Sequence, residues 1–199
     1  MSSPRVTALA TLVIGASTQV VAVAAEALTP AAFVTKASEG GLAEVEMGRV
    51  AAQKGSSAAV KDFGQKMVTD HSQAGDELAK LATSKGLMPV KSLNAEHQKT
   101  LDDLRTKNGA DFDAAYAKLM VQDHDEDIAL FQSASMLADA DLAAYAKRML
   151  PKLREHRQMA GHLVEKAQVG ARWVYESIGH HEGAPPAPVQ GAAPAQPGR

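Results

Sequence analysis

Apolar residues recur every three or four positions along four stretches of the chain, with polar residues between them. This spacing places the apolar residues on one face of an α-helix. The pattern predicts four long helices, at residues 30–54, 57–85, 110–137 and 139–168. Because an amphipathic helix has to bury its apolar face against other elements, these stretches predict a helical bundle.

The connections between the predicted helices differ in length, and the difference indicates the topology. The first two helices and the last two are joined by short turns, so each pair should form an antiparallel hairpin. Residues 86–109 separate the two hairpins and contain a short helical pattern at 94–106. A connection of this length can return along the whole bundle. We therefore expect an all-α fold, a ferritin-like four-helix bundle with one long crossover that carries a short extra helix.

Composition agrees with this fold and narrows the classes of function. The chain has 199 residues and only 4% aromatic residues, and it is rich in alanine, which favours helices over β-sandwiches and barrels. The formal net charge of −2 provides no positive surface for nucleic acid. There is no cysteine, which excludes disulfides, iron–sulfur ligation and a thiol nucleophile. No Ser/His/Asp arrangement of a hydrolase is readable, so the sequence argues against an enzyme more than for one.

The two ends of the chain differ in composition from the helical region. Residues 1–27 have the features of an export signal, with one Arg before an apolar run and small residues at its end. Polar residues at 17–19 interrupt that run, so we expect cleavage within 24–27 and export to the periplasm rather than a membrane anchor. Residues 170–199 are rich in Pro, Ala and Gly and predict a disordered tail. The folded domain is therefore expected at 28–169, and no segment of the mature chain predicts a membrane span.

A short motif occurs twice, as "FGQKMVTDH" at 63–71 and as "YAKLMVQDH" at 116–124. In each copy an aromatic residue, a Met and a His are four positions apart, which places them on one helical face. His71 and His124 therefore interrupt the apolar faces of their helices near the middle, and His156 does the same in the last helix. We expect these three imidazoles to share one layer of the core, with His71 and His124 within about 7 Å of each other.

Acidic residues near the same level complete a candidate metal site. Glu44, in the middle of the first helix, is placed to add a carboxylate to the layer, since packed helices are only about 8–10 Å apart. Asp70 and Asp123 precede two of the His residues and are expected to orient the rings or to bind from the side. The candidate ligands are thus Glu44, Asp70, His71, Asp123, His124 and His156. This set suits a transition metal without distinguishing Fe, Cu, Zn and Mn. His97, in the crossover, is expected to be exposed.

Three functions remain open on these residues. Burying several polar groups in one layer costs free energy unless they satisfy one another or hold a metal. The first hypothesis is a metal-binding protein that serves in storage, buffering or stress protection. The second is a non-catalytic structural or interaction module of the cell envelope, whose metal-free polar layer sets the helix register. The third is a haem-binding or oxidoreductase bundle with a His/Met axial pair. The oligomeric state is not readable from the sequence.

Four segments also resemble a known family: "GGLAEVEMGRVA" (40–51), "VKDFGQKMVTDHSQAGDEL" (60–78), "YAKLMVQDHDEDIALF" (116–131) and "YAKRMLPKLREHRQMA" (145–160). They resemble exported bacterial proteins grouped as domain of unknown function 4142, often labelled predicted outer membrane proteins and placed in the ferritin-like superfamily. The resemblance implies a ferritin-like bundle in the cell envelope, no proven activity, and the same six site residues. Di-iron carboxylate proteins carry Glu-x-x-His on two helices, but no Glu or Asp stands three residues before His71, His124 or His156. Ferroxidase or oxygenase chemistry is therefore not expected.

Overall fold

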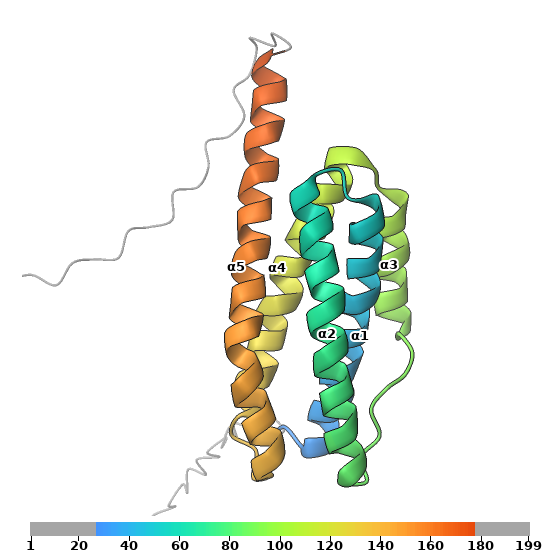
Figure 1. Cartoon of the computed structure of the whole chain (residues 1–199), viewed down its shortest axis with the longest axis vertical. Coiled ribbons are helices and arrows are strands. Elements are labelled where there is room, and N and C mark those ends of the chain that lie inside the picture. The colour runs from blue at the N-terminus through green and yellow to red at the C-terminus, as the bar shows by residue number, and fades with distance from the viewer. Residues whose placement is uncertain (1–26, 178–199) are drawn as a thin grey trace, which may run out of the picture.

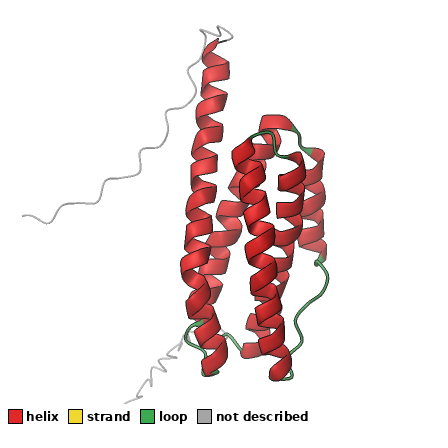
Figure 2. Cartoon of the chain, viewed as in Figure 1, coloured by secondary structure: helices red, strands yellow, loops and turns green. Residues whose placement is uncertain are grey.

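The computed structural model describes residues 27–177 of the chain. This part folds into five helices and contains no strand: α1 (Pro30–Lys54), α2 (Ala58–Ser84), α3 (Ala95–Thr106), α4 (Gly109–Ala134) and α5 (Ala140–Ser177). Four long helices form a bundle, and α3 lies on its outer side (Figure 1). Loops are confined to the short links and to the crossover before α3 (Figure 2). The all-α, ferritin-like bundle with one long crossover is thereby confirmed.

The crossover fixes the directions of the long helices. After α2 the chain returns along the outside of the bundle through α3, so α2 and α4 run in the same direction (Figure 1). α1 packs on α2 and α4, and α5 packs on α4 and α2. The two helices that carry the repeated motif are therefore parallel and lie diagonally across the bundle, where equivalent residues meet at the same level.

Local interactions explain where the helices begin. The side chains of Thr29, Ser57, Asn94 and Asp139 each accept a hydrogen bond from a backbone N–H three residues later, at 2.7 to 3.3 Å. These are the residue types that cap helix N-termini, because they satisfy N–H groups that have no partner within the helix. Asp113 has a similar role between elements. Its two carboxylate oxygens accept hydrogen bonds from the backbone N–H groups of Ser56 and Ser57, at 2.7 and 2.8 Å, and tie the α1–α2 turn to α4.

The end of α5 differs from the prediction. The helix continues to Ser177, whereas the sequence pattern predicted an end near 168 and a disordered tail from 170. Residues 171–177 contain no Gly or Pro, so the helix-breaking composition of the tail begins only after them. The predicted signal segment up to residue 26 and the chain beyond 177 lie outside the described residues.

Two apolar clusters fill the core on either side of a polar layer. One cluster lies toward the α2–α3 end and includes Phe33, Leu78, Phe131, Leu142 and Tyr145. The other lies toward the α1–α2 turn and includes Met47, Phe63, Met67, Phe112, Tyr116 and Met120. The aromatic residues of the two motif copies, Phe63 and Tyr116, face each other with ring centroids 6.1 Å apart. Between the clusters lie the buried polar residues described below.

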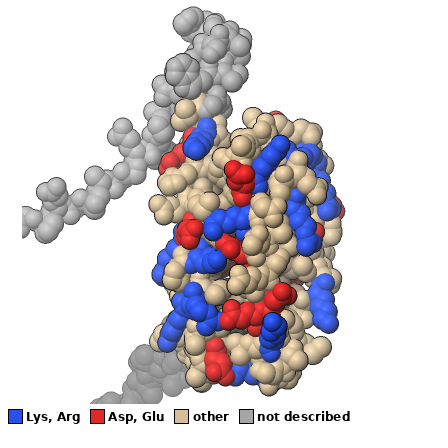
Figure 3. All heavy atoms as spheres, viewed as in Figure 1, with Lys and Arg blue, Asp and Glu red and all other residues tan. Residues whose placement is uncertain are grey.

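The charged side chains on the surface are mixed in sign. On the face seen in Figure 3, positive and negative side chains are interspersed and do not gather into a patch of one sign. None of the described helices combines the length and the apolar character that a membrane span requires.

Candidate metal centre

Three helices of the bundle each bring one histidine to the same level of the core. His71 of α2, His124 of α4 and His156 of α5 are 7%, 0% and 1% exposed. Their ring centroids are 5.5 Å (His71–His124), 5.3 Å (His71–His156) and 5.4 Å (His124–His156) apart, so they form a nearly equilateral triangle. The prediction that His71 and His124 lie within about 7 Å is confirmed.

The ring nitrogens converge as the ligands of one metal ion would. Each imidazole offers one nitrogen, and the three nitrogens lie within 4.8 Å of one another. His71 Nε2 and His156 Nδ1 are 3.3 Å apart. Imidazoles bound at about 2.1 Å in tetrahedral directions would have nitrogens about 3.4 Å apart and ring centres about 5 Å apart. The observed triangle is only slightly wider than this geometry.

Hydrogen bonds on the outer edges of two rings identify which nitrogen carries a free lone pair. His124 Nδ1 is 2.9 Å from the carbonyl oxygen of Met120. A carbonyl can only accept, so Nδ1 donates, and the lone pair resides on Nε2, which is buried without a hydrogen-bond partner. His156 Nε2 donates to Asp70 Oδ2 at 2.8 Å, which leaves the lone pair on Nδ1, the atom that faces His71. Both rings are thus held in the tautomer that a metal requires.

Asp70 orients a ring on a neighbouring helix and not the adjacent His71. Its carboxylate contacts His156 and the ammonium groups of Lys66 and Lys152, each at 3.0 Å. Burial by itself raises the pKa of Asp70, but the hydrogen bonds from Lys66, Lys152 and His156 outweigh it and hold this pKa well below its usual range. Asp70 therefore stays ionised beside His156. Successive residues of a helix point about 100° apart, so Asp70 faces α5 while His71 faces the core.

Glu44 lies beside the three imidazoles and not among the nitrogens that converge. Its Oε2 is 2.8 Å from His71 Nδ1 and its Oε1 is 3.2 Å from His124 Nδ1. Neither contact has the direction of a hydrogen bond, and the side chain is 1% exposed. The carboxyl groups of Glu44 and Asp127 interact through a hydrogen bond that lowers the pKa of Glu44 and raises that of Asp127, so one of the two is protonated. Burial raises the pKa of Glu44 to about 7, although nearby His124 lowers it. The carboxyl group lies beside the far nitrogen of His71, where the carboxylate of a carboxylate–histidine–metal arrangement would lie.

Asp123 and His97 differ from what the sequence predicted. Asp123 is half-buried and lines a small pocket with Glu44, and the ring nitrogen it was expected to orient bonds the Met120 carbonyl instead. Burial raises the pKa of Asp123 to about 7, and the charges of Asp127 and Glu126 add to the effect. His97, expected to be exposed, is half-buried in the same pocket because α3 packs on α1 and α4.

Asp127 is a site residue that the sequence reasoning missed. It lies one turn after His124 on α4. Its Oδ1 packs against Gly40 of α1, so closely that a Cβ added to Gly40 would lie 3.3 Å from this oxygen. Burial raises the pKa of Asp127 well above its ordinary value, and the charge of Glu44 raises it further. The signal was present in "DHDED" (123–127), because a residue three positions after His124 lies on the same helical face.

The imidazoles are held in the neutral form that binds metal ions. Burial is the largest cause that lowers the pKa of His71 and of His124. For His156, burial and the neighbouring His71 together lower the pKa to about 3. A metal ion competes with protons for these nitrogens, so low pKa values keep the site available at neutral pH.

A cavity leads from the outside to this layer. It has a volume of about 330 Å³, is bounded by α1, α2, α5 and the start of the crossover, and has mainly apolar walls. Its lining includes His71, His156 and Asp127. A small molecule can therefore approach the imidazoles from the side of α2 and α5.

Comparison with known proteins gives a family and a fold. No curated protein matches the chain. The crystal structure of a DUF305 fragment from Deinococcus radiodurans is similar, with a TM-score of 0.61 and 13% sequence identity over 69% of this chain and 97% of that chain. At this identity the likeness shows the fold alone. The family described as a domain of unknown function (DUF4142) matches residues 15–163, more than half of the sequence. The chain therefore belongs to the DUF4142 family.

Proposed function

We propose that this protein binds one transition metal ion through His71, His124 and His156. The observation that carries the proposal is the convergence of three buried ring nitrogens, within 4.8 Å of one another, from three different helices. Asp70 and Glu44 act from outside, on the far nitrogens of His156 and His71. Three protein ligands leave a fourth position for water or a small ligand, and the cavity beside His71 and His156 provides the approach.

The free-energy cost of a metal-free polar layer supports the same conclusion. His124 Nε2 is buried without a hydrogen-bond partner. An unpaired buried polar group costs about 1–3 kcal/mol, so the layer is expensive as a purely structural device. A metal ion would use the lone pair of His124 Nε2, and its positive charge would stabilise the Glu44 carboxylate.

The biological role we propose is storage or buffering of a transition metal, or protection against metal stress, in the periplasm. The composition of residues 1–27 supports export. Among Fe, Cu, Zn and Mn we propose Zn²⁺, because three imidazoles with an open fourth position are a usual ligand set of that ion. The three imidazoles converge on one point, whereas the axial ligands of a haem lie on opposite faces of a plane, so the geometry favours a bare ion over haem.

One observation favours a second candidate, a metal-free polar layer that sets the helix register. The 3.3 Å between His71 Nε2 and His156 Nδ1 is also a hydrogen-bond distance. With a proton on its Nε2, His71 would donate to His156 Nδ1, and His156 would donate to Asp70. Such a network would specify helix register without any ion.

Metal analysis of the untagged protein, expressed into the periplasm, tests these two candidates. We expect about one Zn²⁺ per chain after reconstitution and dialysis, and a tetrahedral visible spectrum when Co²⁺ replaces zinc. A content below about 0.1 ion per chain would support the metal-free layer instead.

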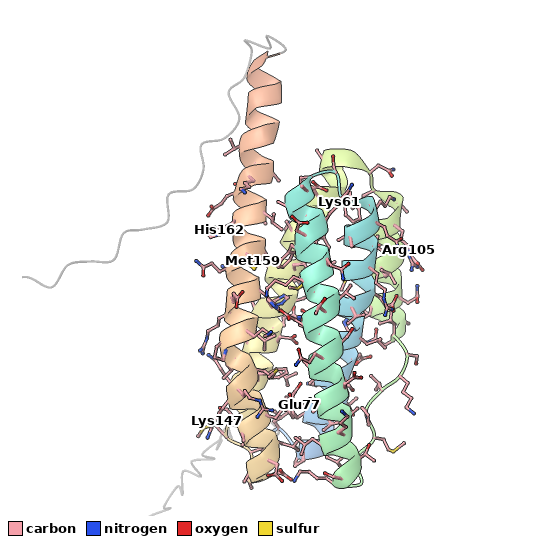
Figure 4. The ribbon with its side chains drawn as sticks, in the orientation of Figure 1. Lys61, Glu77, Arg105, Lys147, Met159 and His162 are labelled. Atoms are coloured by element: carbon pink, nitrogen blue, oxygen red, sulfur yellow. The ribbon has the colours of Figure 1, made fainter. Side chains whose placement is uncertain are left out.

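Substitutions then locate the site. His71→Ala, His124→Ala and His156→Ala should each weaken Zn²⁺ binding by about 100-fold or more, because each removes one of three ligands. His162→Ala is the matched control, since His162 is exposed on α5 and points away from the bundle (Figure 4). Equal losses in His162→Ala and His124→Ala would contradict the proposed site.

A further inference from the structure

We propose that the cavity beside His71 and His156 binds a small carboxylic acid with an apolar body, whose carboxylate takes the fourth position on the metal ion. The inference rests on the proposed function, because it needs an ion on the three imidazoles. It names the class of ligand that would reach this ion, a medium-chain aliphatic monocarboxylate, with octanoate as the representative.

The cavity has the size of a small-molecule site. Its volume is about 330 Å³, and pockets that bind small molecules measure about 300–1,000 Å³. An apolar cavity of about 150 Å³ holds one benzene molecule, so this cavity has room for about ten to twelve non-hydrogen atoms. Octanoate is a ligand of this size.

Most of the cavity wall is apolar and belongs to the core of the bundle. Val45 of α1, Leu78 of α2 and Leu153 of α5 line the cavity and are 6%, 1% and 5% exposed. Leu42 and Met149 line it as well and are half-buried. Such a wall offers water few hydrogen bonds, whereas each methylene group that it removes from water contributes to binding. The wall therefore favours the apolar body of the ligand.

The crossover and α1 hold the outer part of the cavity open. The backbone N–H of Val90 donates to the hydroxyl oxygen of Ser38 at 3.0 Å, which fastens the crossover to α1. Ser38, Pro89 and Val90 all line the cavity. Gly41, one turn after Ser38, lines it too, and a Cβ on Gly41 would meet nothing within 4 Å. The space is therefore preformed and is not filled by a side chain of α1.

The inner end of the cavity has the charge that an anionic group requires. His71, His156 and Lys152 line it. The Lys152 ammonium is 3.0 Å from Asp70 Oδ1, and the other oxygen of Asp70 accepts from His156, so this positive charge lies close to the proposed ion. Three neutral imidazoles leave the double charge of a divalent ion unchanged, and carboxylate oxygens are usual zinc ligands.

The acidic residues near this end already have partners. Asp70 contacts the ammonium groups of Lys66 and Lys152, and the carboxyl group of Asp127 interacts with that of Glu44. Neither carboxyl group converges with the three imidazole nitrogens, so the fourth position on the ion is left to a ligand from the cavity. A molecule with one carboxylate and an apolar body thus matches both the inner end and the wall.

The test is a titration of the Co²⁺-loaded full-length protein with octanoate, followed by visible spectroscopy and calorimetry. We expect the spectrum to change as one octanoate binds per chain, because a carboxylate replaces water on the ion. Acetate has the same charged group without the apolar body and should bind at least about 100-fold more weakly. 1-Octanol has the apolar body without the charge and should leave the spectrum unchanged. The metal-free protein should bind octanoate at least about tenfold more weakly.

A variant that fills the cavity then locates the apolar body. Gly41→Leu should weaken octanoate binding by at least about tenfold and leave Co²⁺ affinity unchanged. Gly161→Leu is the matched control, because Gly161 lies outside the cavity lining and the nearest atom to a Cβ there is Arg157 Nη1, at 3.9 Å. If Gly41→Leu does not melt cooperatively, Ala79→Leu, on the α2 side of the cavity, decides in its place.

The outcomes separate this proposal from the proposed function. A wild type that binds Co²⁺ and Zn²⁺ but shows no spectral change with octanoate would overturn the cavity ligand and leave the metal centre intact. Equal octanoate affinity in the wild type and in the cavity-filling variant would also overturn it, because the ligand would then lie elsewhere. A wild type that binds neither ion would contradict the proposed function, and the metal-bound carboxylate with it.

Discussion

His156 is held from outside by Asp70, and this contact decides which of its nitrogens faces His71 and His124. The carboxylate accepts from Nε2 at 2.8 Å and is itself fixed by Lys66 and Lys152. Partners of this kind set the orientation and basicity of a metal-binding imidazole, and their loss reduces metal affinity by about 10- to 100-fold.

We therefore predict that Asp70→Asn weakens Zn²⁺ binding by about tenfold or more, because the neutral amide accepts more weakly and no longer stabilises charge on the ring. Competition with a chromophoric chelator measures the affinity, and the spectrum of the Co²⁺ form reports the geometry. Asp125→Asn, an exposed acid that pairs with Arg157, is the control and should bind as the wild type does. An Asp70→Asn protein with wild-type affinity would show that Asp70 only links α2 to α5.

Two buried tyrosines differ in whether the hydroxyl has a partner. The Tyr145 hydroxyl donates to the carbonyl of Ala74 at 3.0 Å, whereas the Tyr116 hydroxyl is buried without a partner. The equivalent position of the other motif copy is Phe63, so a plain ring suits this environment.

We predict that Tyr116→Phe leaves the free energy of unfolding unchanged or raises it by about 1 kcal/mol, because it removes an unpaired buried hydroxyl. Tyr145→Phe should lower it by about 0.5–1.5 kcal/mol, because it leaves the Ala74 carbonyl without this donor. Urea unfolding of the two variants measures the difference. Equal losses of stability in both variants would show that the Tyr116 hydroxyl forms a hydrogen bond in the folded protein.

At the scale of elements, two glycines set how closely α1 and α2 approach each other. A Cβ on Gly64 would lie 2.7 Å from the backbone nitrogen of Ala52, and a Cβ on Gly48 would lie 2.8 Å from the carbonyl oxygen of Gly64. Backbone atoms cannot move aside as a flexible side chain can. The crossing lies within one or two turns of Glu44 and His71, so it also sets the distance between them.

Gly64→Ala should destabilise the protein by about 1–3 kcal/mol, the usual cost of forcing extra volume into a packed interface. Gly75→Ala, on the same helix, should stabilise it by up to about 1 kcal/mol, because alanine is the better helix former and a Cβ there meets nothing within 4 Å. Thermal and urea unfolding of the metal-free proteins measure both effects. A Gly64→Ala protein as stable as Gly75→Ala would mean that the two helices separate at little cost.

For the whole molecule, the three histidines connect the two hairpins. His71 belongs to the α1–α2 hairpin, and His124 and His156 belong to the α4–α5 hairpin. An ion bound by all three requires both hairpins in their native positions, so its binding free energy adds to the stability of the fold.

We predict that Zn²⁺ at about 100 times its dissociation constant raises the free energy of unfolding by about 2.7 kcal/mol. The melting temperature should rise with zinc concentration and return to its metal-free value with a chelator. The His124→Ala protein should show no such rise, because it lacks one of the three ligands. Zinc-dependent stabilisation of equal size in that variant would place the ion elsewhere.

The helices and their order were determined by local features of the sequence. Capping by Thr29 and Ser57 and the spacing of apolar residues act within a few residues, so α1 was predicted at 30–54 and found at Pro30–Lys54. The three-histidine layer was also readable, because His71, His124 and His156 each interrupt an apolar face near the middle of a helix. The end of α5 was predicted wrongly, because the composition of the whole segment 170–199 obscured the helix-compatible residues at its start.

The tertiary structure alone decided which side chains meet. Sequence spacing gives the direction in which a residue leaves its helix, but not the group on the neighbouring helix that it reaches. Asp70 thus contacts His156 and not His71, and Glu44 faces the Nδ1 atoms, outside the three converging nitrogens. These outcomes depend on differences of an ångström or two between packed helices. Such distances are set by the volumes of all the side chains in the core together, and no single stretch of sequence contains them.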